Sequence, residues 1–231
     1  MKNRPFSLLS ALAMVGALYA VVAMSLVNAK SSVKPPEGFR SPILALEFAQ
    51  DNAVIDSVFN LSRATPAEIH FNTQCFDLGV QLDYLFILAY AGFMLFFALQ
   101  SRHLGQKSHW LGILFALLAA LADVLENGQL RAIYAQIELG QRDFSEHFSA
   151  LHFWTCLKFC STGAYFLAFT AFFWKANWLG KIVVLAALGA LLCWAGAVFM
   201  SPKTWADAMF GMIFLAFAGA MFFGLRYRGG E

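Results

Sequence analysis

The chain has 231 residues, of which 60% are hydrophobic and only 13% are charged, and its formal net charge is +2. Soluble domains contain about 45–50% apolar and about 25% charged residues, so this composition excludes an ordinary water-soluble globular protein. Lys and Arg residues form no dense block, and we therefore expect no nucleic-acid partner.

Long apolar runs recur along the chain, and each approaches or exceeds the ~20 residues that a helix needs to cross a bilayer. Lipid cannot satisfy exposed backbone polar groups, so these runs must be helices. We predict an all-α polytopic membrane protein with six transmembrane helices, in contact with the lipid bilayer. The predicted spans are residues 6–27, 82–99, 110–127, 148–174, 182–200 and 205–225.

The first span begins after a basic N-terminal stretch and ends in "VNA", a pattern shared with cleaved secretory signals. The apolar core of such a signal is about 7–15 residues long, whereas this run has 22 residues. We therefore interpret residues 1–29 as a retained membrane anchor, and a cleaved signal is the alternative.

Residues 30–78 separate the first two spans and are too few, and too poor in cysteine, for an independent domain. Ser41 and Pro42 are typical of a helix start, and apolar residues follow at helical spacing, with Glu47 on another side of the wheel. Residues 65–68, "TPAE", are a capping box with proline at the first helical position. We predict two amphipathic helices that cap the outer face of a five-span bundle, residues 79–231.

Basic residues predict the orientation, because cytoplasmic loops of membrane proteins are enriched in Lys and Arg. One set of termini and short loops holds eight cations and a single acid, Glu231. These cations are Lys2, Arg4, Arg102, Lys107, Lys175, Lys181, Arg226 and Arg228. We therefore expect both termini to be cytoplasmic in the plasma membrane, a bacterial inner membrane, with segment 30–78 outside.

The fourth predicted span carries an ammonium group, Lys158, within an apolar run. Successive residues of a helix turn by about 100°, and several polar side chains fall on the face that carries Lys158. They are His147, Thr155, Ser161, Thr162 and Tyr165. The span thus has a polar stripe that runs inward from its outer boundary.

The third predicted span has a matching face, with small residues that permit close helix contact and with acids at its outer end. A lone cation near the centre of a membrane helix costs about 2.5–3.5 kcal/mol. We therefore predict an ion pair between Asp123 and Lys158, with Glu126 and Asn127 beside it and His147 at the mouth of the site.

These groups define a candidate polar pocket in the outer half of the membrane. Intramembrane charges are by default candidates for function, and a structural role in helix register is the alternative. The candidate ligand-binding residues are Asp83, Asp123, Glu126, Asn127, His147, Thr155, Lys158, Ser161 and Thr162.

The leading interpretation is a non-enzymatic protein that binds a small polar ligand, a lipid headgroup or a partner subunit in this pocket. A proton-coupled small transporter is one alternative. An interfacial enzyme that acts on lipid or on an envelope precursor is the other.

Motifs for established chemistry are missing from the sequence. His147 and His152 are five residues apart and therefore about 140° apart on a helix, and no H-x-x-x-H, H-E-x-x-H or G-x-S-x-G motif occurs. A Ser161–Lys158 dyad would need a neutral lysine, which Asp123 opposes. We expect no metal or cofactor and assign no catalytic residue.

Overall fold

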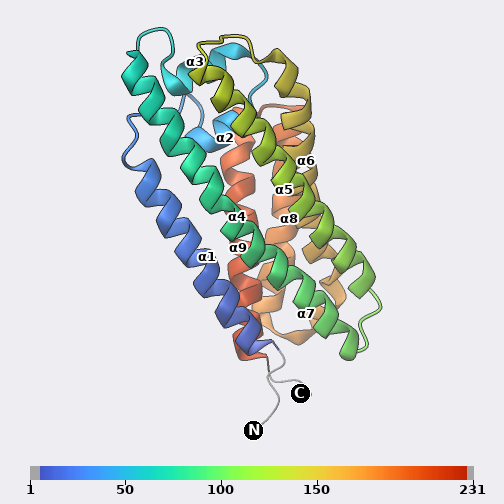
Figure 1. Ribbon diagram of the computed structural model, residues 1–231. Coiled ribbons are helices and arrows are strands. Elements are labelled where there is room, and N and C mark those ends of the chain that lie inside the picture. The colour runs from blue at the N-terminus through green and yellow to red at the C-terminus, as the bar shows by residue number, and fades with distance from the viewer. Residues whose placement is uncertain (1–5, 228–231) are drawn as a thin grey trace.

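The computed structural model describes residues 6–227, which form helices and connecting loops without any strand. Nine helices occur in this part of the chain (Figure 1). They are α1 (Ser7–Asn28), α2 (Pro42–Glu47), α3 (Asn52–Phe59), α4 (Pro66–His103), α5 (His109–Glu138), α6 (Ser145–Ala168), α7 (Thr170–Ala176), α8 (Trp178–Phe199) and α9 (Pro202–Arg226).

Five of these helices, α1, α4, α5, α8 and α9, are long and apolar enough to cross a membrane. The helices α6 and α7 together pass the same test, with a bend of 53° between them. The predicted all-α membrane architecture is therefore confirmed, with five or six helices of spanning length.

The predicted span 148–174 is interrupted at Phe169, where α6 ends and α7 begins. The Thr170 hydroxyl donates a hydrogen bond to the carbonyl of Leu167 at 2.7 Å. Such a side-chain bond competes with the helical ladder and favours a bend. Neither proline nor glycine occurs at this position, so the usual sequence signal for a kink is missing.

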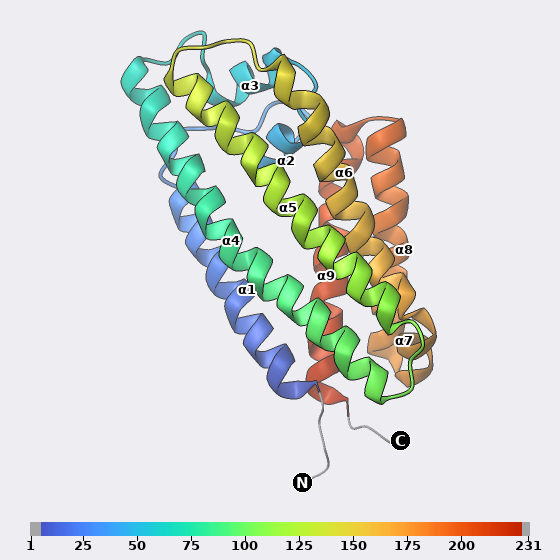
Figure 2. The ribbon, with the colours of Figure 1, turned by 45° about the vertical axis from the view of Figure 1, so that its right-hand side comes forward.

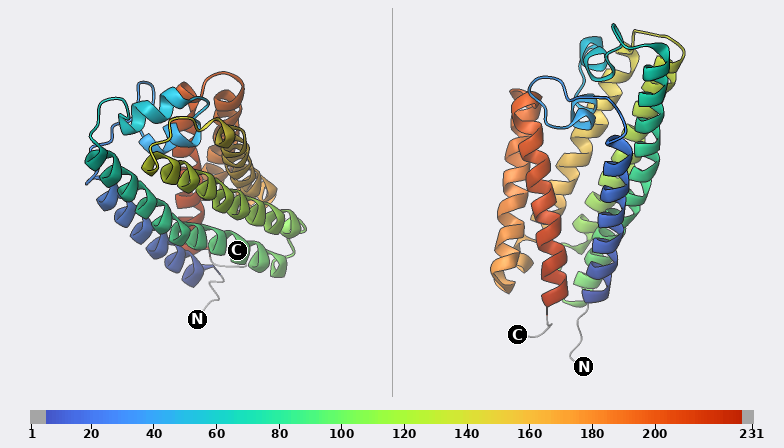
Figure 3. Two further views of the ribbon diagram at one scale, coloured as in Figure 1. Left: turned by 45° about the horizontal axis from the view of Figure 1, so that its top comes forward. Right: turned by 90° about the vertical axis from the view of Figure 1, so that its left-hand side faces the viewer.

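The long helices pack side by side, α1 against α4, α4 against α5, α5 against α6, and α8 against α9 (Figures 1 and 2). Contacts between α1 and α9 bring the two ends of the described chain together. The rings of Phe6 and Tyr227 are 5.7 Å apart, and α2 and α3 lie at the opposite end of the bundle (Figure 3).

The capping box at residues 65–68 is present, with the Thr65 hydroxyl accepting from the Glu68 amide and the Glu68 carboxylate accepting from the Thr65 amide. The helix that starts there is α4, which runs without a break for 38 residues. The predicted boundary between the outer segment and the membrane bundle, between residues 78 and 79, therefore lies within this helix. Its polar residues find partners on α5, as in the 2.7 Å contact between Asp77 and Arg131.

The helix predicted to start at Ser41 is split in two, because Asp51 caps a new helix by accepting a hydrogen bond from the Val54 amide. The short helix α2 contacts α5, α6 and α9, and its last four residues, Glu47 included, are buried. Asn52, at the start of α3, donates to Asp143 in the loop before α6. This hydrogen bond holds the pKa of Asp143 below its usual value.

The end of the bundle at which Phe6 and Tyr227 lie is filled with aromatic rings. Phe97 on α4 is fully buried and stacks on Phe6 at 4.5 Å and on Phe173 at 5.4 Å. The rings of Phe169 and Phe172 pack edge to face on Phe97, and that of Phe223 packs edge to face on Phe173. The polar residues considered below lie in the other half.

Candidate functional site

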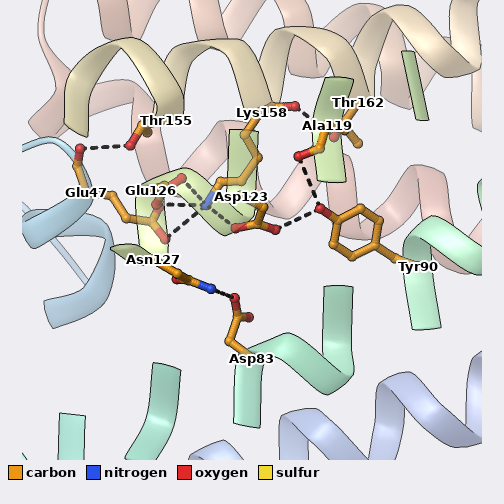
Figure 4. A network of polar contacts seen from close by, with 10 residues as sticks. All are labelled: Glu47, Asp83, Tyr90, Ala119, Asp123, Glu126, Asn127, Thr155, Lys158 and Thr162. Carbon is orange, nitrogen blue, oxygen red and sulfur yellow. Dashed lines mark hydrogen bonds and ion pairs between the residues drawn. The ribbon is translucent and has the colours of Figure 1, made fainter. Parts of the chain in front are cut away.

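Lys158, on α6, lies at the centre of a buried group of carboxylates (Figure 4). Its Nζ atom is 2.7 Å and 2.9 Å from the two carboxylate oxygens of Glu126. It is also 3.2 Å from Glu47 and 3.3 Å from Asp123. The predicted Asp123–Lys158 ion pair is therefore confirmed, and Glu126 is the closer partner.

The α5 side of the site follows from helical spacing, because residues three and four apart share a face. Asp123, Glu126 and Asn127 are all buried on that face. Asp123 accepts a 2.8 Å hydrogen bond from the hydroxyl of Tyr90 on α4. Asn127 donates a 2.8 Å hydrogen bond to Asp83, which is also on α4 and is partly buried.

Glu47 was not predicted to belong to the site, since its position on the helical wheel placed it away from the apolar face. The structure instead inserts α2 between the long helices, and Glu47 is only 8% exposed. The Thr155 hydroxyl donates to the backbone carbonyl of Glu47 at 3.1 Å and fixes its position. A single acid within the apolar stretch "PILALEFA", residues 42–49, is the sequence signal that points to this burial.

The remaining candidate residues contribute less to this group. The Thr162 hydroxyl donates to the backbone carbonyl of Lys158 at 2.9 Å. Ser161 is buried but makes none of the contacts of the ammonium group. His147 lies 2.9 Å from Gln129 and 3.4 Å from Glu146, so it is not one of the partners of Lys158.

We call Glu47, Asp83, Asp123, Glu126 and Lys158 the Lys158 cluster. It has four carboxyl groups and one ammonium group, and the described chain places no second Lys or Arg within ion-pair distance of its acids. Buried carboxylates without a counter-charge are costly and take up a proton or a cation instead. The cluster thus has three more acidic than basic groups, and neutral donors reach two of its acids, since Tyr90 donates to Asp123 and Asn127 donates to Asp83.

No three His, Cys, Asp or Glu side chains between residues 6 and 227 are arranged to hold a metal ion. One oxygen of Glu47, Oε2, is buried without a hydrogen-bond partner among the described residues. A carboxyl oxygen in that position is a good acceptor for a proton.

Two surface grooves occur in the described chain. One, of about 690 Å³, lies between the C-terminal part of α5 and the N-terminal part of α4, and the other, of about 470 Å³, lies beside α3. The groups that contact the Lys158 ammonium line neither groove.

No protein-family model, no curated protein and no solved structure matches the chain.

Proposed function

We propose that the protein is a non-enzymatic integral membrane protein whose Lys158 cluster binds protons from the outer side of the membrane. Through Glu47, the bound protons control how firmly the segment of residues 30–64 is held on the membrane helices. The observation that carries this proposal is the presence of three buried carboxyl groups around one ammonium group, with a fourth, that of Asp83, hydrogen-bonded to the neighbouring Asn127.

The proposed response depends on the degree of ionisation. With every acid ionised, Glu47, Asp123 and Glu126 repel one another around a single cation. A proton on one of them relieves that repulsion and leaves Lys158 with partners. Glu47 belongs to the separate short helix α2. Ionisation can therefore weaken the contact between α2 and the long helices without moving any of the long helices.

The proposed topology has six spans, with α6 and α7 as one, both termini in the cytoplasm and segment 30–64 outside. The proximity of Phe6 and Tyr227 supports an even number of crossings. The exposed cations of the α4–α5 loop and of the α7–α8 region support a cytoplasmic location for that end. A plasma membrane, the inner membrane of a bacterium, is the membrane that we propose.

The same carboxylate excess favours a second candidate, the binding of a small organic cation such as an amine in place of a proton. Coupled transport across the whole membrane is less favoured, since the half of the bundle around Phe97 is filled with aromatic rings. An enzymatic role has no observation in its favour beyond the presence of acids.

We expect the stability of the protein in detergent to fall as the pH rises above about 4, the pKa at which carboxyl groups of the unfolded chain release their protons. The folded cluster holds protons that the unfolded chain releases, and stability falls with pH wherever the folded state binds more protons. Each additional bound proton contributes a slope of about 1.4 kcal/mol per pH unit. The free energy of unfolding, measured by denaturant titration at several pH values, checks this expectation.

The control for this titration is a matched pair of variants. Glu126→Gln removes a buried acid of the cluster and should flatten the slope, whereas Glu146→Gln removes an exposed acid of α6 and should leave it unchanged. Methylammonium added at constant pH forms a second arm, and stabilisation by it would favour the organic cation. A slope that is the same in wild type and Glu126→Gln would contradict both.

A further inference from the structure

The groove between α4 and α5 shares helix α5 with the Lys158 cluster, because α5 carries groove residues as well as Asp123 and Glu126. Its walls carry two polar pairs, His70 with Glu138 at 2.6 Å and Asp77 with Arg131 at 2.7 Å. These side chains are partly exposed, between 32% and 58%, so the groove is open to water. Tyr134 of α5 also lines it.

Tyr134 differs from the other groove residues because it is almost completely buried, with 3% of its surface exposed. Its ring packs edge to face on Phe59 of α3 and Phe76 of α4, at 5.8 Å and 6.1 Å. Its hydroxyl has no hydrogen-bond partner among the described residues. An unpaired buried hydroxyl costs about 1–3 kcal/mol, so this group requires a partner such as water.

Tyr134 lies about two helical turns from Glu126 on α5, and α5 also contacts α2, which carries Glu47. Asp77 lines the groove, whereas Glu47 and Glu126 contact Lys158. Glu47 also has the unpaired buried oxygen, Oε2. Two unpaired buried polar atoms thus belong to residues of two helices that contact each other, α5 and α2.

We propose that the α4–α5 groove is the aqueous entrance to the Lys158 cluster and that Tyr134 is the last proton-relaying residue on the way. This inference rests on the proposed proton-binding function. The Tyr134 hydroxyl accepts a proton from a hydronium ion in the groove, which becomes water, as it passes its own proton, through intervening water, to the carboxylate of Glu47. The hydroxyl is neutral before and after the transfer, and Glu47 gains one proton.

The groove side chains support this role by their chemistry. The His70 imidazole, a group that can both donate and accept a hydrogen bond, is 58% exposed on the groove wall. Asp77 and Glu138 supply negative charge that attracts protons into the groove, and Arg131 offsets part of it.

The test is the rate at which the cluster takes up protons after a pH jump, in the full chain in lipid, followed by the infrared band of protonated carboxyl groups. Tyr134→Phe removes only the hydroxyl, and Tyr19→Phe, at an exposed site on α1, is the matched control. We expect Tyr134→Phe to slow proton uptake at least about tenfold. Positioned proton-transfer groups contribute about 100-fold or more, but water can replace part of that.

Blocking the groove provides a second readout that does not depend on Tyr134. In a background with the four native cysteines replaced by alanine, Gln74→Cys labelled with a bulky thiol reagent should slow uptake. Labelled Ser62→Cys, in the other groove, should leave the rate unchanged.

The two proposals fail in different ways in this experiment. If the carboxyl band changes with pH but Tyr134→Phe and the groove label leave its rate unaltered, the entrance is elsewhere and proton binding stands. If the wild-type band does not change with pH, the proposed function is wrong, and the entrance is wrong with it.

Discussion

Replacing Lys158 with methionine should lower the free energy of unfolding by about 3–5 kcal/mol at neutral pH, as expected when one partner of a buried ion pair is removed. Methionine has a similar shape and fills the space, so packing changes little. The loss arises because Glu47, Asp123 and Glu126, which lie 2.7–3.3 Å from the ammonium nitrogen, then repel one another without a cation between them.

Denaturant unfolding in detergent measures this effect, with Lys107→Met as the control because Lys107 is exposed in the α4–α5 loop. The difference between Lys158→Met and wild type should shrink as the pH is lowered, since protonated acids no longer repel. Equal stability of Lys158→Met and wild type at neutral pH would show that the cluster does not depend on its cation.

The second large effect is expected at Phe97, where alanine should destabilise the protein by about 3 kcal/mol. Phe→Ala in a packed core costs about 3–5 kcal/mol. The low end applies because lipid, unlike water, solvates an exposed apolar helix well, so lost packing contacts supply most of the cost. Phe97 is fully buried and meets the rings of Phe6 and Phe173.

Its neighbour Phe96 provides the matched control, because the same substitution on the same helix removes a ring that is 59% exposed. Phe96→Ala should change the unfolding free energy by less than about 0.5 kcal/mol. Similar losses for both variants would mean that α4 does not present the Phe97 face to the other helices. The aromatic packing that disfavours a polar path across the membrane would then lose its support.

Much of the fold could be predicted from hydropathy alone. Runs of spanning length mark α1, α4, α5, α8 and α9, since a bilayer imposes length and helical structure on any segment that crosses it. The bend at Phe169 could not be predicted, because it depends on a threonine side chain that bonds to the backbone and not on proline or glycine.

The candidate site was predictable to the extent that its residues obey helical spacing. Lys158 needs a counter-charge, and the acids of α5 lie on one face, so the pairing of these helices follows from charge and periodicity. Glu47 could not be placed in the same way. Its position depends on the insertion of a six-residue helix between α5, α6 and α9, a long-range contact that local periodicity does not encode.

The length of α4 was missed for a related reason. Residues 66–81 carry many polar side chains, and polarity alone indicates a segment outside the membrane. In the structure these side chains remain on a continuous helix and bond to α5, as Asp77 does to Arg131. The polar extension of α4 and α5 also forms the groove that we propose as the entrance to the cluster.

The infrared spectrum of the full chain in lipid at neutral pH tests most directly whether the Lys158 cluster holds protons. We expect a carbonyl band from protonated carboxyl groups that Glu126→Gln or Glu47→Gln weakens and that Glu146→Gln leaves unchanged. A spectrum in which every carboxyl group is ionised at neutral pH would contradict proton storage in the cluster.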